Sequence, residues 1–579
     1  MIGLYSKNRY EWVVAEHGAF TQNLVTVPLY DTLGAEAVAF IIDQTGMTTV
    51  FCSIVELPKL ISFKTDSATA SSMKTLTNVV VFEVPTSELR TKATDAGLTL
   101  RSFDEVIAVG KANPAKHTPP SPDDISTICY TSGTTGNPKG AMLTHRNLVA
   151  SAAGANYAGL NITAKDNYLS YLPLAHVFER LVQVALWYAG AAVAFYQGDA
   201  LKLVDDLKDV RPTVFCSVPR LYNRFYDKIV GGAKAAGGVK AKLFAQGYAA
   251  KQQGLQRSNS LHHWFWDKLV FKKVAGRVGL DRCRVMATGS APIAPHVLEF
   301  LRVVFGAQVV EGYGQTECGG VATVTPVEDQ NKMGNVGCPL PYNEVKLVSV
   351  PEMGYLWNDT KHGNDPSNAI ACSGRGEVCY KGLNVFKGYY KDPEKTAEAL
   401  DSDGWLHSGD IGLWDSNGNL RIIDRKKNIF KLSQGEYVAP EKIENVYLKS
   451  SFIAQAFVYG DSLHAVLVGI IVPNFDNLHP WAKENGLENA TNAELATNKD
   501  VKKMILDDLT RVGKEAKLVG FEQIKDLHFE PTAWTPDDLL TPSFKLKRAD
   551  AKKKYSAIID TLYDNLNDTV AGVKGLKQG

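Results

Sequence analysis

Strand-like and helix-like runs alternate along the chain, and this alternation restricts the fold more than any other feature. Residues 25–29 (VTVPL) and 48–53 (TTVFCS) are short apolar runs, and the amphipathic run 35–43 (AEAVAFIID) lies between them. The same order returns later in residues 191–196, 203–210 and 213–218. Connections of this kind join parallel strands and place helices on both faces of a sheet. The sequence therefore predicts an α/β fold with parallel sheets.

The charge and cysteine content argue against several classes of protein. The chain has 579 residues with 63 basic and 62 acidic side chains, so no overall positive field would recruit nucleic acid. Eight cysteines are scattered along the chain without a Cys-x-x-Cys pair. This pattern indicates a reducing compartment and argues against a zinc site.

The apolar segments do not resemble membrane or secretory segments. The longest uncharged stretch, residues 181–196, is too short to cross a bilayer and breaks at Gly190, so we expect a buried helix that runs into a strand. Arg9, Glu11 and Glu16 interrupt the apolar residues near the N-terminus, which does not fit a secretory signal. We therefore expect a cytosol-facing chain with no transmembrane helix or signal peptide.

Residues 130–140, YTSGTTGNPKG, form a loop suited to a polyphosphate. Its glycines permit positive φ and close backbone approach, its hydroxyls donate hydrogen bonds, and its lysine supplies a charge. The residues in question are Thr131, Ser132, Gly133, Thr134, Thr135 and Lys139. Pro138 and Gly140 break the Walker A pattern, so an ordinary P-loop kinase or GTPase is not expected. For the loop taken alone, a flexible turn is an equal alternative to a nucleotide triphosphate site.

Four further segments narrow the function. They are ATGSAP (287–292), EGYGQTE (311–317), the block from DGWLHSGDIGLW to APEKIE (403–444) and LTPSFKLKR (540–548). Together with the loop at 130–140 they resemble the adenylate-forming, AMP-binding enzymes, and specifically the long-chain acyl-CoA synthetases, over nearly the whole chain. The long-chain subfamily is favoured by the insert before residue 287 and by LYSKNRYEW and VPLYDTLG. The resemblance implies that a fatty acid is joined to ATP as acyl-AMP with loss of pyrophosphate, and that CoA then displaces AMP.

The resemblance also implies roles around the nucleotide. The loop from Thr131 to Lys139 would hold the β- and γ-phosphates and the departing pyrophosphate. Tyr313 would stack on adenine, Thr316 would donate to the α-phosphate, and Glu317 would place Mg²⁺ beside it. The nucleotide would further be lined by Gly289, Ser290, Ala291 and Gly314. For the first three of these, a plain strand-to-turn junction is almost as good an explanation.

The C-terminal part would exchange catalytic groups between the two reactions. Asp410 would accept hydrogen bonds from both ribose hydroxyls, with Arg425 as its partner, and Lys427 corresponds to the family's hinge. Lys545 would bridge the carboxylate and the α-phosphate during adenylation. Lys547 is the rival assignment, two residues on and on the same face of an expected strand.

Two assignments have structural alternatives. Gly435 would border the pantetheine tunnel, where a side chain would obstruct the thiol, and a turn before a capped helix is a compatible reading. His176, in LPLAHVFER, matches a family position near the substrate carboxylate. A histidine in an apolar segment is more often a core residue with satisfied hydrogen bonds, so an orienting or gating role is one of two interpretations.

The resemblance also predicts the domain organisation. Residues 1–424 would form the large AMP-binding domain, with a helical insert at about 226–279, and residues 425–579 a smaller, mobile α+β lid with its hinge near Lys427. Relatives carry on the order of a hundred more residues before the point that matches IGLYSKNRYEW, so we expect the family's N-terminal segment to be missing (a property of the family).

The expected substrates and cofactors are a fatty acid, ATP, Mg²⁺ and CoA, without nucleic acid. We further expect peripheral contact with a membrane surface, such as that of the endoplasmic reticulum or the peroxisome. Two other functions stay open. One is an adenylating enzyme that hands acyl-AMP to a carrier or another acceptor. The other is an inactive chain that binds fatty acid or membrane.

Overall fold

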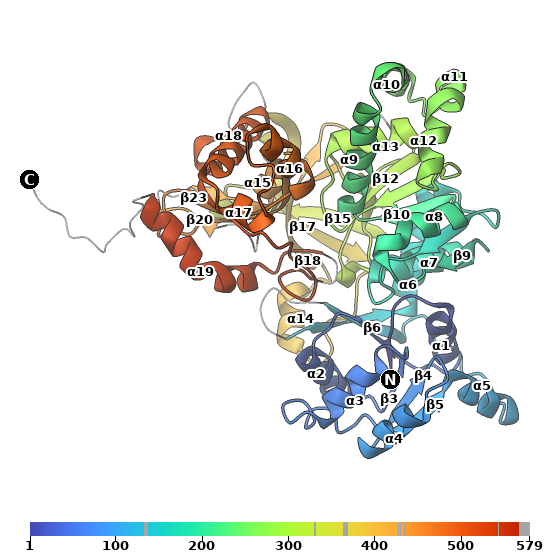
Figure 1. Ribbon diagram of the computed structural model, residues 1–579. Coiled ribbons are helices and arrows are strands. Elements are labelled where there is room, and N and C mark those ends of the chain that lie inside the picture. Colours follow the sequence, from blue (N-terminus) through green and yellow to red (C-terminus); the bar gives the residue numbers. More distant parts are fainter. Residues whose placement is uncertain are drawn as a thin grey trace, which may run out of the picture. The chain divides into compact units, whose positions relative to one another are not determined.

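The computed structural model describes residues 1–131, 137–328, 330, 332–362, 369–426, 428, 430–433, 436–541 and 544–566 (Figure 1). The chain divides into two compact units. Unit 1 consists of Met1–Lys346, Val378–Ser408 and Trp414–Arg421. Unit 2 consists of Leu347–Glu377, Gly409–Leu413 and Ile422–Gly579.

Unit 1 begins with a seven-stranded sheet in the order β5-β4-β3-β1-β2-β6-β7. The strands run parallel except for the antiparallel pair β6 and β7. They are β1 (Ile2–Tyr5), β2 (Thr26–Leu29), β3 (Thr49–Cys52), β4 (Asn78–Val81), β5 (Thr99–Ser102), β6 (Ile125–Thr131) and β7 (Lys139–Thr144). The connecting helices are α1 (Tyr10–Phe20), α2 (Ala35–Thr45), α3 (Leu57–Thr65), α4 (Ser87–Asp95) and α5 (Phe103–Ala112). Ile41 and Ile42 of α2 are fully buried in the core that this sheet shares with its helices.

A second seven-stranded sheet of unit 1 has the order β14-β13-β12-β11-β10-β8-β9. Strands β8 to β12 are parallel, and β13 and β14 add antiparallel strands at one edge. They are β8 (Asn167–Ser170), β9 (Ala192–Phe195), β10 (Val214–Ser217), β11 (Val285–Thr288), β12 (Gln308–Tyr313), β13 (Thr323–Val324) and β14 (Cys338–Pro339). The helices are α6 (His145–Ala155) with η1 (Asn156–Leu160), α7 (Val177–Tyr188), η2 (Ala200–Lys202), α8 (Leu203–Val210) and α13 (Pro295–Phe305).

The segment between β10 and β11 is helical. It contains α9 (Pro219–Ala235), α10 (Gly238–Ser258), α11 (Trp264–Trp266), the π-helix η3 (Asp267–Phe271) and α12 (Lys272–Arg277). Phe225 of α9 and Phe271 of η3 are buried in the same core as Leu298 and Leu301 of α13. The helices therefore extend the core of the second sheet outward.

A third sheet has the order β15-β17-β18-β19, with β16 paired to β17. Its strands are β15 (Asn343–Val348), β16 (Lys361–His362), β17 (Ile370–Gly382), β18 (Leu406–Asp415) and β19 (Leu420–Arg425). The short elements η4 (Thr316–Cys318), η5 (Pro351–Met353) and α14 (Pro393–Ala399) complete this part of the chain.

The C-terminal part of unit 2 packs helices around a three-stranded sheet in the order β22-β23-β24. The strands of this sheet are β22 (Ile453–Tyr459), β23 (Leu467–Pro473) and β24 (Ile524–Phe529). A separate pair is formed by β20 (Phe430–Lys431) and β21 (Tyr437–Val438). The helices of this part of unit 2 are α15 (Pro440–Tyr447), α16 (Phe475–Glu484), α17 (Asn492–Thr497), α18 (Lys499–Glu515), η6 (Gly520–Glu522) and α19 (Arg548–Asn565). Two apolar clusters cover this sheet, one built with α18 and the other with α19.

The structure confirms the predicted α/β class and the alternation that carried it. Residues 25–29 contain β2, residues 35–43 lie within α2, and residues 48–53 contain β3, because the period of the apolar residues in each run matches the element that buries them. The stretch 181–196 is the end of α7, a glycine at φ 72° and β9, as predicted. Among the described helices, none combines the length and apolar character that a membrane span requires.

Candidate functional site

The hairpin of β6 and β7 frames the glycine-rich loop. Thr131 pairs with Lys139 across the hairpin, and Tyr130 pairs with Gly140. A Cβ at Gly140 would lie 2.7 Å from Cγ2 of Ile128, so a side chain does not fit here. Packing of the hairpin thus requires glycine where a Walker A loop carries a metal-binding hydroxyl. The loop residues Ser132, Gly133, Thr134 and Thr135 lie outside the described residues.

A tyrosine connects the lysine of this hairpin to the acidic residue of the EGYGQTE segment. The Tyr389 hydroxyl donates to Oε1 of Glu317 at 2.6 Å. On the same ring, Nζ of Lys139 lies 5.3 Å from the centroid, which is cation–π distance. Burial raises the pKa of Tyr389, and the Glu317 charge raises it further, so the phenol stays a hydrogen-bond donor at neutral pH. The structure therefore brings Lys139 and Glu317 to one site through a residue that the sequence analysis missed.

Glu317 is held by a tight turn after β12. Thr316, Glu317 and Cys318 form η4, and the Phe386 amide donates to the Glu317 carbonyl at 2.9 Å. A Cβ at Gly314 would lie 2.7 Å from Cα of Val321, so this turn needs glycine. Thr316 and Glu317 are both half-buried on this turn. The segment thus presents a hydroxyl and a carboxylate from neighbouring positions.

Tyr313 closes β12 beside a second aromatic ring. Its ring centroid lies 6.0 Å from that of Tyr380, with the rings tilted by 51°. Tyr313 is half-buried, whereas Tyr380 is fully buried and supports it. An aromatic face at the end of a parallel strand is a suitable surface for a flat heterocycle.

The ATGSAP segment forms a turn next to Tyr313. Because β11 and β12 are parallel neighbours, Gly289 follows β11 at the same sheet edge where β12 ends. A Cβ at Gly289 would lie 2.9 Å from the Gly312 carbonyl oxygen, and Ser290 has φ 68°, a conformation that costs energy for a non-glycine residue. Ala291 continues this turn. The two segments are thus in close backbone contact.

Glu311 is hydrogen-bonded to the backbone directly after this turn. The sequence analysis did not single it out. Its side chain is 6% exposed, and burial raises its pKa to about 8, while Arg302 and the Ile293 amide act in the opposite direction. The amide of Ile293 is its backbone hydrogen-bond partner, and this residue lies just after the ATGSAP turn. Glu311 is therefore a buried residue that positions the backbone after the ATGSAP turn.

His176 begins α7. Its Nδ1 accepts a hydrogen bond from the Phe178 amide at 3.1 Å, so the imidazole caps the helix. The loop before it follows β8, at the point where the strand order reverses between β8 and β10. Ligands of α/β sheets bind at such switch points. His176 thus has a structural role as a cap at a location where substrates bind in this class of fold.

Asn8 links the two sheets of unit 1 at this switch point. Its Nδ2 donates to the Leu172 carbonyl at 2.6 Å, and its Oδ1 accepts from the Leu174 amide at 2.9 Å. Because Asn8 follows β1 and the accepting loop follows β8, the carboxyl ends of both parallel sheets meet here. The sequence offered no signal for this contact, since the partners are separated by 164 and 166 residues.

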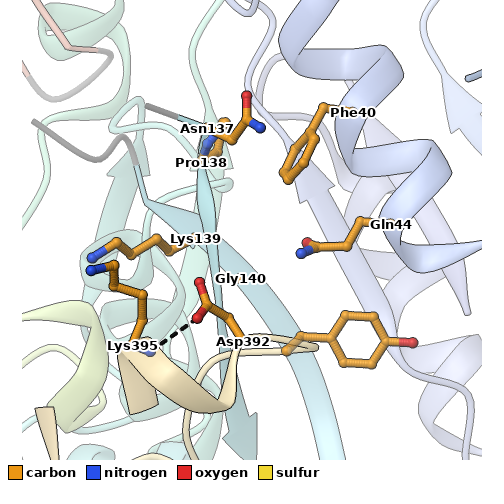
Figure 2. A pocket seen from close by; sticks show the side chains of 9 residues that line it. Phe40, Gln44, Asn137, Pro138, Lys139, Gly140, Asp392 and Lys395 are labelled. Atoms are coloured by element: carbon orange, nitrogen blue, oxygen red, sulfur yellow. Dashed lines mark hydrogen bonds between the residues drawn. The ribbon is translucent and has the colours of Figure 1, made fainter. Parts of the chain in front are cut away.

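A pocket of about 250 Å³ lies beside the hairpin (Figure 2). Its lining is mostly polar and includes two lysines, Lys139 and Lys395, and one carboxylate, Asp392. Oδ1 of Asp392 accepts from the Lys395 amide at 2.9 Å and so caps α14. Phe40 and Gln44 of α2 form the opposite wall (Figure 2). Positive charge thus lines a hollow next to the glycine-rich loop.

In unit 2, Asp410 lies half-buried on β18. The adjacent Gly409 amide donates to Oε1 of Glu377 at 3.1 Å, and the Gly409 carbonyl accepts from the Lys426 amide at 2.8 Å. The backbone of Arg425 ends β19, while its side chain lies outside the described part of the structure. Lys427 and Gly435 are also outside the described residues.

The two candidate lysines of unit 2 differ in their surroundings. Lys545 is exposed, and its backbone is fixed by the Thr541 amide, which donates to the Lys545 carbonyl at 2.7 Å. Nζ of Lys547 donates to the Asp538 carbonyl at 3.2 Å, directly before α19. The prediction that both lysines lie on one strand was wrong. The described residues here form only an isolated bridge between Leu540 and Leu546, because Phe544, with φ 61°, and the backbone bonds between Thr541 and residues 544 and 545 form a turn.

Comparisons with known proteins agree with this geometry. The family model described as AMP-binding enzyme matches residues 1–390. Long chain acyl-CoA synthetase 6, peroxisomal, from Arabidopsis thaliana is 46% identical over 566 residues, covering 98% of this chain and 78% of that protein. Long-chain-fatty-acid–CoA ligase 1 from Homo sapiens is 45% identical over 575 residues, with coverage of 98% and 78%.

Two solved structures are similar to nearly the whole chain. The adenylation domain of a carboxylate reductase from Mycobacterium chelonae has a TM-score of 0.78 at 25% identity and covers 97% of this chain and 80% of that chain. The corresponding domain from Segniliparus rugosus, solved with AMP and a co-purified carboxylic acid, has a TM-score of 0.75 at 25% identity, with coverage of 98% and 82%.

Proposed function

Since the chain belongs to the AMP-binding enzymes and, within them, to the long-chain fatty acid–CoA ligases, we propose that Lys139, Tyr389 and Glu317 together form the phosphate-binding centre of its adenylation reaction. The enzyme activates a long-chain fatty acid with ATP to acyl-AMP and then forms acyl-CoA. The hydrogen bond from Tyr389 to Glu317, with Lys139 over the same ring, is the observation that carries this assignment.

The chemistry requires two anions to approach each other. An oxygen of the fatty acid carboxylate attacks the α-phosphorus of ATP, the bond to the bridging oxygen breaks, and pyrophosphate leaves with the electron pair. Positive charge and oriented donors near the phosphates lower this barrier. Lys139 and the loop from Thr131 through Ser132, Gly133, Thr134 and Thr135 bind the β- and γ-phosphates in this scheme.

Glu317 is the proposed ligand for Mg²⁺. The ion usually binds through one or two carboxylates together with substrate phosphates, and a half-buried carboxylate next to a phosphate loop fits that arrangement. When bound, Mg²⁺ neutralises phosphate charge. Tyr389 fixes one oxygen of Glu317 by hydrogen bonding and thereby sets the direction of the carboxylate. Lys139 contributes a second positive charge.

The nucleoside is assigned to the end of the second sheet of unit 1. Tyr313, supported by Tyr380, offers its face to adenine, and Gly289, Ser290, Ala291 and Gly314 line it with backbone groups. Thr316 donates to the α-phosphate. The fatty acid carboxylate is assigned to the switch point near His176, whose capping bond through Nδ1 holds the imidazole in a fixed orientation.

Residues 425–579 act in this proposal as a lid on the domain 1–424, hinged near Lys427. Asp410 and Arg425 bind the ribose. Lys545 bridges carboxylate and α-phosphate during adenylation in this proposal, and Lys547 is the rival assignment, which the half-reaction assays of the two alanine variants distinguish. Gly435 leaves room for pantetheine, so that the CoA sulfur attacks the acyl carbon and AMP leaves.

The enzyme is also proposed to face the cytosol and to touch a membrane surface peripherally. Its substrate is a long-chain acid, and such acids partition into bilayers because each buried methylene contributes about 0.8 kcal/mol. A relative described as peroxisomal supports an organelle surface as the location.

The proposal is tested by incubating the purified chain with ATP, Mg²⁺, CoA and acids of increasing length, and by quantifying acyl-AMP and acyl-CoA by mass spectrometry. Glu317→Gln and Lys545→Ala should lose both products, whereas Lys547→Ala should retain them. Acyl-AMP without thioester in the wild type would favour transfer to a carrier. Absence of both products from folded protein would favour a non-catalytic lipid-binding chain.

A further inference from the structure

The helical segment 264–277 carries an exposed face that the ligase reaction does not use. Two aromatic residues at its start are exposed, Trp264 by 86% and Phe265 by 42%, and Leu269 is 36% exposed. Exposed lysines follow the two aromatic residues along the segment. We call this surface the insert face, and it consists of Trp264, Phe265, Lys268, Leu269, Lys272 and Lys273.

The helical geometry explains why these side chains share one side. Their pairs recur every four residues, and the π-helical turn η3, with its wider repeat, keeps them aligned between α11 and α12. The intervening residues face the core: Phe271 and Ala275 are buried there, and Trp266 packs against the same cluster. The segment is thus amphipathic, with an apolar buried side and a second side that mixes aromatic and basic residues.

Buried contacts hold the insert face rigidly. Nζ of Lys251, whose side chain is 1% exposed, forms an ion pair with Asp267 at 2.6 Å and so joins α10 to η3. A Cβ at Gly247 would lie 2.9 Å from Cε3 of Trp266, so α10 approaches this segment closely. The exposure of Trp264 is therefore a property of a well-packed segment. In Figure 1, α10 and α11 lie at the top of the view, above α12 and α13.

The helical insert that carries the insert face has a net positive charge. Residues 226–279 contain eight lysines and two arginines against two aspartates. One of these aspartates is Asp267, which is already paired with Lys251. Positive charge beside an exposed tryptophan is complementary to an anionic lipid surface, where the indole lies among the headgroups and the lysines contact phosphates.

We propose that the insert face docks the enzyme on a bilayer containing anionic lipid. An acidic protein surface also matches the positive charge, but it does not require an exposed tryptophan and phenylalanine at the start of the segment. The lipid surface is therefore favoured. The insert face would be the site of the peripheral membrane contact described under the proposed function, and this inference rests on that part of the proposed function.

The test measures sedimentation of the full chain with phosphatidylcholine vesicles, with and without phosphatidylserine. Wild type should bind the anionic vesicles, and binding should weaken with salt. Lys268→Gln/Lys272→Gln/Lys273→Gln should weaken binding about a hundredfold, since each lysine near a membrane surface contributes about fivefold. Trp264→Ser/Phe265→Ser should also lose binding. Matched controls in unit 2 are Trp357→Ser, at a tryptophan 69% exposed, and Lys499→Gln/Lys503→Gln/Lys514→Gln, at exposed lysines.

A fluorescence measurement identifies the contact directly. Brominated phosphatidylcholine mixed with phosphatidylserine should quench tryptophan emission in the wild type. Trp264→Phe should keep vesicle binding and lose most of this quenching, because the aromatic anchor stays and the fluorophore is gone. The proposal is overturned if wild type ignores anionic vesicles, if the insert variants bind like the unit 2 controls, or if the wild type self-associates through this face in the absence of lipid.

ATP–pyrophosphate exchange with micromolar fatty acid, measured without vesicles, separates this inference from the ligase function. The insert variants should retain exchange within twofold of wild type. Loss of vesicle binding with intact exchange supports the docking surface. Intact vesicle binding without exchange in wild type would contradict the proposed active site and leave the insert face supported.

Discussion

Tyr389→Phe isolates the hydrogen bond on which the proposed phosphate site depends. The substitution removes one hydroxyl and leaves the ring under Lys139 in place. A hydrogen bond to a charged group contributes about 1.5–3 kcal/mol. If that bond orients Glu317 toward the transition state, kcat/KM for adenylation should fall roughly tenfold to hundredfold. Glu317 is half-buried and can bind water after the change, so the melting temperature should move little.

The assay is ATP–pyrophosphate exchange driven by long-chain fatty acid across a titration of Mg²⁺. Tyr389→Phe should lower the exchange rate and raise the Mg²⁺ concentration needed for half-maximal rate. Conversion of supplied acyl-AMP and CoA to thioester should stay near the wild-type rate, since pyrophosphate takes no part in that step. A readout limited to one half-reaction separates a role in phosphate binding from a general loss of structure.

Tyr248→Phe is the matched control. It also removes a tyrosine-to-glutamate hydrogen bond, from Tyr248 to Glu299 at 3.3 Å, in the helical insert of the same unit. Exchange in this variant should equal that of the wild type. Equal rates for Tyr389→Phe and Tyr248→Phe, or a Tyr389→Phe enzyme with an unchanged Mg²⁺ dependence, would refute the argument.

Three further predictions concern positions that the structure describes. Lys545→Ala should reduce adenylation at least a hundredfold and spare thioester formation from supplied acyl-AMP. Lys547→Ala should spare both half-reactions and lose only the small stabilisation from its hydrogen bond to the Asp538 carbonyl. Reversed results in assays of the two half-reactions would exchange the two assignments. Gly314→Ala should abolish exchange in protein that still folds, because its Cβ would lie 2.7 Å from a backbone atom of Val321, and wild-type exchange would show that the turn can shift. Glu311 has a folded-state pKa of about 8 against an ordinary 4.5, so its contribution to stability is complete below about pH 4.5 and is lost as the pH rises through about 8. Glu311→Gln should remove this slope of a few kcal/mol, at about 1.4 kcal/mol per pKa unit, and parallel denaturant curves of the two proteins over this range would contradict it.

The local features of this enzyme could be predicted from its sequence. The period of apolar residues identified β2, α2 and β3, since burial of one face is a local property of each run. The glycine-rich loop was recognisable because its residue types meet the needs of a phosphate ligand, and EGYGQTE was recognisable by its resemblance to the family. The prediction of a strand that carries both Lys545 and Lys547 was wrong, because Phe544 adopts a positive φ and the backbone turns between Thr541 and Lys545.

What the sequence alone determined is thus the α/β class, the family and the candidate groups for each half of the reaction. The tertiary structure decided which groups meet: Tyr389 reaches Glu317 across 72 residues, and Asn8 reaches the loop after β8 across more than 160. It also decided that Trp264 faces outward while Trp266 faces the core. Such pairings leave no periodic pattern in the chain, because they arise from the packing of elements whose separation in sequence carries no information about their distance in space.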